Sequence, residues 1–350
     1  MTNLTILALA TLCVGDDVST VSVAKIGRPI AAKVDPEGVV HLVCDAKAGP
    51  MYTRSEDGRA FSGAIPVVVV GPDTPGLEFN AWDLAIGKGG RVFVAMGTNA
   101  WKLKLPQEEW GFYLATLDPG QSAFSPVRNL NRKPSEGFSI AADDRGNVTA
   151  CWLSDRLYAN VSHDNGDTFG PNVEIRADYN PCNCCTTSSA YDESGRLAVL
   201  YREETNNERD MYLVLWDQAR NEAVRKRVGR TPWRLDGCPM TYFTIARAKG
   251  GLLAAWPTKG EVAFARLDRD GNPTGSPEIA TPGRSGMRSS LAAVPGPDGS
   301  ALIAWKEGAL IGWQRYDANG RPIGPSGRVE GPGPGAVGVA TRDGRFILYR

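Results

Sequence analysis

The chain has 350 residues, with 39 basic and 39 acidic side chains, so its formal net charge is zero. This balance argues against a protein that tracks nucleic-acid phosphates or an acidic membrane surface through excess basic charge. Only two histidines are present, which excludes a histidine-rich zinc centre and an H-E-x-x-H metalloprotease. Forty glycines, 24 prolines and 42% hydrophobic residues together predict a turn-rich chain with a folded core.

The first predicted element is an apolar run at residues 4–14, which is too short to span a bilayer. It is either the hydrophobic part of a signal peptide at residues 1–15, with cleavage near Ala8 to Ala10, or a buried strand. The signal peptide predicts a secreted or periplasmic protein, whereas the strand leaves it cytoplasmic. Seven cysteines are present, and the six that remain without Cys13 fit an oxidising compartment.

From residue 29 onward, one unit recurs: an apolar strand, a polar turn with glycine, and a second apolar strand, which is the signature of a β-hairpin. Six of the seven hairpins are followed by a further pair of strands, and no long amphipathic helix interrupts the series. The turn glycines, 45 to 56 residues apart, are Gly38, Gly90, Gly146, Gly195, Gly251, Gly299 and Gly344. This spacing, with four strands per unit, is typical of the blades of a β-propeller.

The seventh hairpin, at residues 336–350, reaches the C-terminus without its two outer strands. We expect residues 18–26 to supply its outermost strand and residues 4–12, if they are retained, to supply its third strand. Such closure would protect an open sheet edge and join both termini in one fold. The sequence therefore predicts an all-β protein in which residues 16–350 form a single propeller domain. The hairpin count gives seven blades, with six as the alternative.

One turn carries a distinctive motif, S-x-D-x-G-x-T-F. Its aspartate can accept hydrogen bonds from the amides of its own turn, its glycine tolerates a positive φ, and its aromatic ring packs back between strands. The motif resembles the Asp-box, or bacterial neuraminidase repeat, of sialidase-like propellers. In that family the boxes lie on the turns between the third and fourth strands, opposite the active site. The resemblance implies a structural role for Ser162, Asp164, Gly166 and Phe169, and for Ser55 and Asp57 in a shortened copy.

In a propeller, the loops that enter each inner strand and those between the second and third strands share one face. These loops are the longest and chemically most unusual segments of the sequence, so we expect a ligand site at this mouth of the channel. Aromatic and basic side chains on them are candidates for ligand contact, with packing between blades as the alternative role. The candidates are Trp82, Trp101, Trp110, Trp233 and Arg234.

The sialidase resemblance also implies three arginines that hold a sugar carboxylate, a Tyr–Glu pair as nucleophile and an aspartate as acid/base. Structural ion pairs at the bases of loops are the alternative. The matching positions are Arg28, Arg202 or Arg209, and Arg288 for the arginines, Glu203 or Glu204 with a tyrosine such as Tyr242 for the pair, and Asp83 for the acid. Because no complete catalytic motif is present, we expect a monomer that binds a glycan or another acidic small molecule without hydrolysis. An exo-α-sialidase-type glycoside hydrolase is the second hypothesis.

Four cysteines, Cys182, Cys184, Cys185 and Cys238, precede the inner strands of two neighbouring units. Three interpretations are open: a disulfide that joins the loops, such as Cys182–Cys238, a thiolate site for copper or zinc, or redox-active thiols. The disulfide is favoured, so a metal is expected only as an alternative. Together with residues 201–202 and 233–239, these segments resemble secreted bacterial sialidase-like proteins labelled exo-α-sialidase.

Overall fold

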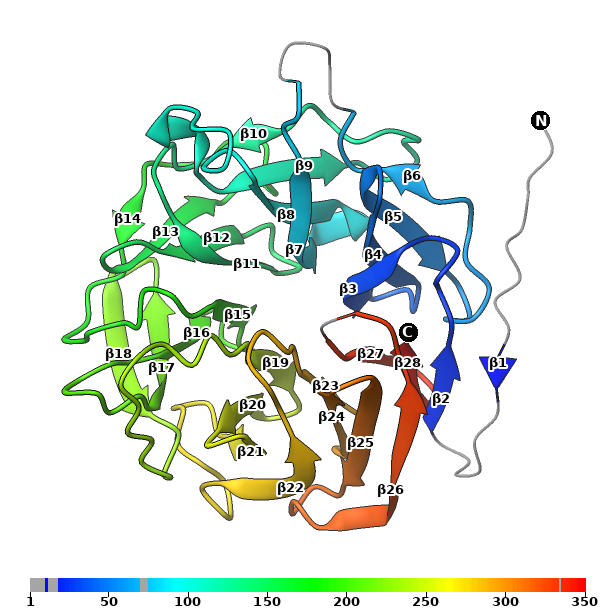
Figure 1. The fold of residues 1–350 in the computed structure, drawn as a ribbon, viewed down its shortest axis with the longest axis vertical. Coiled ribbons are helices and arrows are strands. Elements are labelled where there is room, and N and C mark those ends of the chain that lie inside the picture. The colour runs from blue at the N-terminus through cyan, green and yellow to red at the C-terminus, as the bar shows by residue number, and fades with distance from the viewer. Residues whose placement is uncertain (1–9, 12–17, 70–74, 334) are drawn as a thin grey trace.

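The computed structural model describes residues 10–11, 18–69, 75–333 and 335–350, which form seven four-stranded β-sheets arranged in a ring (Figure 1). The predicted all-β propeller is confirmed, with seven blades rather than six. We name the strands of each blade A to D from the axis outward. Within the described ranges, no helix has the length and apolar character that a membrane crossing requires.

Six blades are built from strands that follow one another in the chain. Blade one consists of β3 (Arg28–Val34), β4 (Val40–Ala46), β5 (Gly49–Ser55) and β6 (Ile65–Pro66). Blade two consists of β7 (Phe79–Ile86), β8 (Val92–Thr98), β9 (Tyr113–Leu117) and β10 (Arg128–Asn129). Blade three consists of β11 (Glu136–Ala142), β12 (Val148–Leu153), β13 (Leu157–Ser162) and β14 (Val173–Glu174). Single helical turns, η1 (Lys88–Gly90) and η2 (Gln107–Glu109), lie in the loops of blade two.

Blades four to six repeat the same order further along the chain. Blade four consists of β15 (Thr187–Tyr191), β16 (Leu197–Arg202), β17 (Met211–Asp217) and β18 (Glu222–Arg227). Blade five consists of β19 (Thr244–Ala248), β20 (Gly251–Thr258), β21 (Glu261–Leu267) and β22 (Ile279–Arg284). Blade six consists of β23 (Ala292–Pro295), β24 (Ala301–Glu307), β25 (Leu310–Tyr316) and β26 (Pro322–Glu330). Their B strands are buried on both faces between neighbouring blades, which explains why they read as continuous apolar runs in the sequence.

Blade seven joins the two ends of the chain, with the order β27 (Val337–Ala340), β28 (Phe346–Tyr349), β2 (Val18–Val21) and β1 (Ala10–Thr11). Closure by terminal strands is therefore confirmed, but the predicted order of the two N-terminal segments is wrong. The segment that begins at Val18 is the third strand, pairing in parallel with β28, because its apolar side chains Val21 and Val23 pack into the same core as Tyr349. Residues 1–9 and 12–17, which carry most of the predicted signal peptide, lie outside the described residues.

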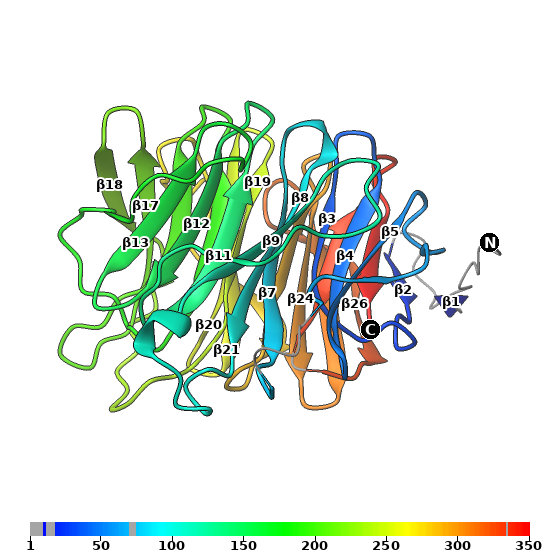
Figure 2. The ribbon, with the colours of Figure 1, turned by 90° about the horizontal axis from the view of Figure 1, so that it is seen from above.

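The seven A strands surround an axial cavity of about 710 Å³. Each A strand contacts the A strands of both neighbouring blades, and the strands run from one face of the disc to the other (Figure 2). Many of the residues that line it are small and only partly buried, including Ala31, Ala142, Ala190 and Ala246, which leaves the axis open. The cavity therefore follows from the choice of alanine where a larger residue would fill the centre.

Side-chain bonds to backbone amides join neighbouring blades close to the axis. Asp45 Oδ1 accepts from the amide of Ala81 at 3.0 Å, and Asp83 Oδ2 accepts from the amide of Ile140 at 3.0 Å. Blades one to three are thus joined to one another by carboxylates beside the axis.

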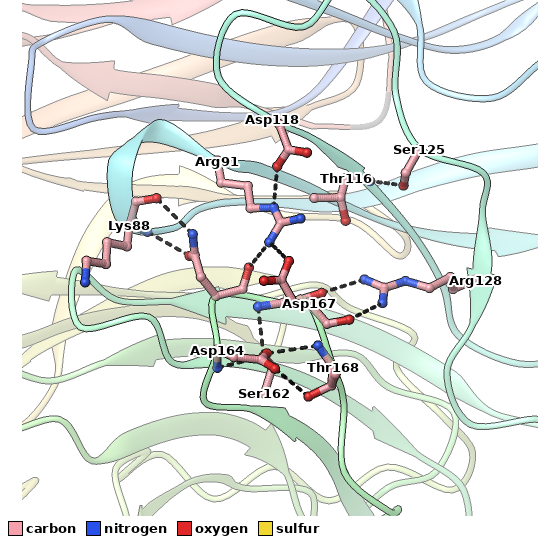
Figure 3. Close-up of polar contacts among 12 residues, drawn as sticks. Lys88, Arg91, Thr116, Asp118, Ser125, Arg128, Ser162, Asp164, Asp167 and Thr168 are labelled. Carbon is pink, nitrogen blue, oxygen red and sulfur yellow. Dashed lines mark hydrogen bonds and ion pairs between the residues drawn. The ribbon is translucent and has the colours of Figure 1, made fainter.

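The turn between β13 and β14 carries the S-x-D-x-G-x-T-F motif and forms the hydrogen bonds that its residue types predict (Figure 3). Ser162 Oγ donates to Asp164 Oδ1 at 2.7 Å and accepts from the amide of Gly166 at 2.8 Å. The amide of Thr168 donates to the same carboxylate oxygen at 2.9 Å. These bonds, led by the one from the Thr168 hydroxyl, hold the pKa of Asp164 well below its ordinary value.

This turn is fixed to blade two by two arginines (Figure 3). Arg91 donates to the carbonyl of Asn165 at 2.7 Å and forms ion pairs with Asp167 and Asp118. Arg128 donates to the carbonyl of Gly166 at 2.8 Å, and its guanidinium lies 5.3 Å from the ring centre of Phe169. The motif thus joins blades two and three on the face opposite the loops that enter the A strands.

The shortened copy joins blades one and seven in a similar way. Ser55 Oγ donates to Asp57 Oδ1 at 2.8 Å, and the Tyr349 hydroxyl donates to the carbonyl of Gly58 at 3.1 Å. Phe61 packs edge-on against Tyr349 with ring centres 5.5 Å apart. Both turns therefore act as contacts between blades.

The first testable prediction concerns closure. Val21 is 0% exposed, so Val21→Asp would bury a carboxylate without a partner. We expect the variant to lose roughly 3 kcal/mol or more of unfolding free energy, measured by urea denaturation followed by tryptophan fluorescence. The exposed Lys25 on the same segment provides the control, and Lys25→Asp should unfold like the wild type. Equal stability of Val21→Asp and Lys25→Asp would contradict the closure.

A second prediction follows from His41, which is buried in β4 between the Tyr52 hydroxyl and the carboxylate of Asp35. Burial lowers the pKa of His41, so the unfolded chain takes up a proton at a higher pH than the folded chain does. The stability that neutral His41 contributes above the ordinary histidine pKa of about 6.5 is therefore lost as the pH falls from that value toward the lower pKa of the folded state. Urea midpoints of wild type and His41→Gln at about pH 7.5 and about pH 5.5 should show a smaller loss in the variant. Identical losses would remove His41 as the source.

Candidate functional site

The mouth of the axial cavity brings together two arginines that lie far apart in the sequence. Arg28 begins β3 in blade one, and Arg288 lies in the loop that enters β23 in blade six. Both charges act on Tyr242, whose side chain lines the cavity. Burial raises the pKa of Tyr242, while Arg288 and Arg28 oppose this shift and Glu136 adds to it. The charges of two cations and one carboxylate therefore act on the tyrosine.

An aromatic contact spans the channel at this level. Trp82 comes from blade two and Tyr242 from blade five, yet their ring centres are 6.1 Å apart in an edge-to-face arrangement. Phe138 of blade three supports Trp82 at 5.4 Å. Because blades two and five are not neighbours in the ring, the contact crosses the axis. We call Trp82 and Tyr242 the aromatic bridge.

The two arginines are held differently. Arg28 Nη2 donates to Asp45 Oδ2 at 2.9 Å, while its side chain stays 44% exposed. Arg288 is exposed, and its position is set by its backbone amide, which donates to the carbonyl of Met240 at 2.7 Å. Within the described chain, Arg288 forms no ion pair with a carboxylate. The mouth therefore carries one positioned and one unpaired guanidinium, both open to solvent.

Arg202 and Arg209 do not join this pair. Arg202 is fully buried, donates to the carbonyls of Arg209 and Pro257 at 2.7 Å each, and lies 5.0 Å from the ring centre of Trp233. Arg209 is buried as well, and neither arginine lines the axial cavity. The arrangement of three arginines that the sialidase resemblance implies is therefore not assembled by the described residues.

A Tyr–Glu pair exists, but it is not the expected one. Glu203 accepts from the Tyr201 hydroxyl at 2.5 Å and forms a two-point ion pair with Arg225. Burial, with the Glu203 charge next in size, raises the pKa of Tyr201 above its ordinary range. The Tyr201–Glu203 pair lies at the C-terminal end of β16. Tyr242, the expected partner, has no hydrogen bond to a carboxylate within the described ranges.

Asp83 lines the cavity and has a raised pKa because of burial, although Lys33 opposes the shift. Its carboxylate accepts from the amides of Leu84, at 2.8 Å, and Ile140. This side chain is thus committed to fixing the register of β7 and β11.

The remaining aromatic candidates lie away from the axial cavity. Trp110 Nε1 donates to the carbonyl of Leu105 at 3.0 Å, which shapes the loop between β8 and β9. Trp101 is 59% exposed on the same loop, with the Lys102 ammonium 5.5 Å from its ring centre. The Trp233 ring lies over the guanidinium of the buried Arg202. Arg234 is exposed, and its Nε lies 3.9 Å from Glu208 Oε2.

The predicted disulfide between the two cysteine loops is confirmed, but its partners differ from the suggested Cys182–Cys238 pair. Cys184 is bonded to Cys238, with Cα atoms 6.5 Å apart. Cys182 is held in the interior because its amide donates to the carbonyl of Arg202 at 2.8 Å. The turn that follows points Cys184 outward, toward the loop of Cys238, and buries Cys185.

Cys182 has an unusual environment for a free thiol. Arg209 Nη1 donates to its sulfur at 3.0 Å. The hydrogen bond from Cys185, followed by the charges of Arg209 and Arg202, lowers the pKa of Cys182 to about 6 despite its burial.

Two contributors to the mouth were not singled out as site residues from the sequence. Asp45 holds Arg28, and the carboxylate of Glu136 contributes a negative charge that acts on Tyr242. Each lies at the end of a strand on the face where the entering loops meet, which is the only sequence signal that could have identified them.

Comparison with known proteins establishes the fold alone. No protein-family model matches the chain, and no curated protein matches it in sequence, so the sialidase resemblance gains no support from a family match. A polysaccharide lyase, the ulvan lyase of family PL25, matches with 12% identity and a TM-score of 0.57, over 90% of this chain and 87% of its own.

Two further solved structures show the same architecture. A protein of unknown function from Dyadobacter fermentans has 10% identity and a TM-score of 0.52, covering 88% of this chain and 96% of its own. The Dos1 propeller has 12% identity and a TM-score of 0.52, covering 92% and 78%.

A third prediction tests whether Glu203 is structural. Its carboxylate is 5% exposed, so Arg225→Met would leave a buried charge with only Tyr201 as partner. We expect a loss of about 2 to 4 kcal/mol in unfolding free energy, reduced from the fully buried case because Arg225 is partly exposed.

Arg220→Met is the matched control, since Arg220 pairs with Asp217 at 3.6 Å on the surface. This variant should change stability by less than about 1 kcal/mol in the same urea titration. Equal effects of the two substitutions would show that the buried pair contributes no more to stability than the surface pair.

From all of these observations, the chain is established as a seven-bladed β-propeller whose structural neighbours include a polysaccharide lyase.

Proposed function

We propose that the protein binds an acidic small molecule, a carboxylate-bearing sugar in the first instance, at the mouth of its axial channel and does not hydrolyse it. One observation carries this proposal: the charges of exposed arginines from blades one and six both act on Tyr242, which forms the aromatic bridge with Trp82 between blades five and two. Guanidinium groups match carboxylates in shape and charge, and aromatic rings offer an apolar surface for a sugar ring.

The two arginines would contribute in different ways. Asp45 holds Arg28 in place before a ligand arrives, which lowers the entropy lost on binding. Arg288 has no acidic partner within the described residues, so it supplies the positive charge that a carboxylate would neutralise. Glu136, which lies near enough to act on Tyr242, would accept hydrogen bonds from ligand hydroxyl groups.

The same geometry argues for binding without hydrolysis. A tyrosine nucleophile needs a base within hydrogen-bond reach, or a lowered pKa. Burial raises the pKa of Tyr242, and no carboxylate in the described chain accepts a hydrogen bond from it. Asp83, the proposed acid, is occupied by two backbone amides. A propeller of the same fold is a polysaccharide lyase, so the architecture is compatible with a carbohydrate ligand.

The fourth prediction is a binding experiment by isothermal titration calorimetry. Sialyllactose and a uronic-acid oligosaccharide should bind, whereas neutral lactose should bind at least tenfold more weakly. Arg28→Ala and Arg288→Ala should each lower the affinity for the acidic sugars by about 10- to 100-fold, as expected for loss of a charged hydrogen bond.

Arg247→Ala is the matched control, because Arg247 is an exposed arginine near the opposite end of the same channel. It should leave the affinity unchanged. Equal binding of lactose and the acidic sugars, or an equal loss in Arg247→Ala, would refute the assignment. Release of the fluorophore from a fluorogenic sialoside by the wild type, abolished in Arg28→Ala, would instead support the hydrolase hypothesis.

A further inference from the structure

Four sulfur atoms gather between blades four and five, outside the axial cavity. Cys182 Sγ lies 3.4 Å from Cys185 Sγ and 3.7 Å from Cys184 Sγ. Cys238 Sγ, from the other loop, lies 3.9 Å from both Cys182 and Cys185. In a tetrahedral site with metal–sulfur bonds of about 2.3 Å, the sulfur atoms are about 3.8 Å apart. Four sulfur pairs are thus already close to the edges of such a tetrahedron.

The charges around these sulfurs point to an anionic group. Arg202 and Arg209 are both buried, and neither forms an ion pair with a carboxylate within the described chain. The nearby carboxylates of Glu203 and Asp210 are engaged by other arginines. Arg202 Nε is buried without a hydrogen-bond partner among the described residues. Two buried cations without an ion pair to a carboxylate are costly, because burial removes their hydration.

Four thiolates around a divalent cation carry two net negative charges, which equals the positive charge of Arg202 and Arg209. Copper(I) in the same site would leave three negative charges and no such balance. We propose that reduction of the Cys184–Cys238 disulfide converts this cluster into a tetrathiolate site for a divalent metal of the zinc type. The disulfide form is the closed state, and the reduced form is the metal-binding state.

The chemistry balances if a dithiol is the reductant. The dithiol gives two electrons and two protons to the Cys184–Cys238 bond, leaves as a cyclic disulfide, and frees two thiols. Those thiols join Cys182 and Cys185 as ligands, and binding of the divalent metal releases the protons that the four sulfurs still carry. No backbone rearrangement beyond the two loops is required, since the sulfurs are already in contact.

Hydrogen bonds from backbone amides and from an arginine side chain support the cluster, as outer contacts support thiolate sites. The amide of Met240 donates to Cys238 Sγ at 3.3 Å, and Arg209 Nη1 donates to Cys182 Sγ at 3.0 Å. The amide of Cys185 donates to the carbonyl of Cys182 at 3.0 Å, which folds the C-x-C-C segment into a tight turn. This turn, across which Cys182 and Cys185 have C-x-x-C spacing, brings three sulfurs to one point.

The fifth prediction uses the full chain with cobalt(II) as the probe, because tetrahedral cobalt thiolates have intense visible bands. After reduction with a phosphine under anaerobic conditions, the protein should bind one cobalt per chain, and zinc should displace it. The oxidised protein should bind none. Cys182→Ser, which keeps the disulfide for folding, should lose the cobalt bands after reduction.

Cys44→Ala is the matched control, since Cys44 is a buried free cysteine in β4 of blade one. It should bind cobalt like the wild type. Arg209→Met keeps all four sulfurs and should weaken zinc binding about tenfold or more, measured by competition with a chromogenic chelator. Circular dichroism of each reduced variant would establish that it is folded.

Three outcomes would overturn the proposal: a folded, reduced wild type without stoichiometric cobalt, equal binding by Cys182→Ser, or equal binding by the oxidised protein. Alkylation and mass spectrometry give an independent measurement. Zinc should protect Cys182, Cys184, Cys185 and Cys238 together in the reduced protein and leave Cys44 unaffected. Protection of only two of the four would also exclude the tetrathiolate.

Discussion

Parallel pairing of β2 with β28 is the constraint on which the rest of this molecule depends. Blade seven has just two strands of its own from the C-terminal end, so without a further partner β28 would be an open sheet edge. The N-terminal segment completes it, burying Val21 and Val23 beside Tyr349. Tyr349 then reaches the turn of blade one through Gly58, so closure also fixes the neighbour on the other side. The channel mouth exists because this ring holds distant loops around one axis.

Residues that the sequence offers as one site divide into two in space. The axial group, with Arg28, Trp82, Tyr242 and Arg288, lines or surrounds the channel mouth. Arg202, Glu203 and Arg209 instead lie around the cysteine cluster between blades four and five. Sequence position alone could not separate the groups, because loops from the same face lead both toward the axis and outward to the gap between blades.

Much of the fold could be predicted because it depends on local patterns. The seven hairpins follow from alternating strands and turn glycines, and the Ser162 turn follows from its own hydrogen-bonding residues. Contacts between distant segments could not be predicted in the same way. The order of the closing strands depends on which apolar side chains fit the last core, and the meeting of Trp82 with Tyr242 depends on the channel width. The disulfide likewise uses Cys184 rather than Cys182 because the amide of Cys182 donates a hydrogen bond to the carbonyl of Arg202 in β16.

The two groups are nevertheless physically connected. Met240 lies two residues after Cys238; its amide donates to the Cys238 sulfur, and its carbonyl accepts from the amide of Arg288. Arg288 also reaches the Met240 sulfur at 3.8 Å. The backbone at both Met240 and Arg288 has a positive φ, 46° and 56°, so each position is set by these contacts rather than by its own preference. One short segment therefore joins Cys238 directly to the arginine of the channel mouth that has no ion pair in the described chain.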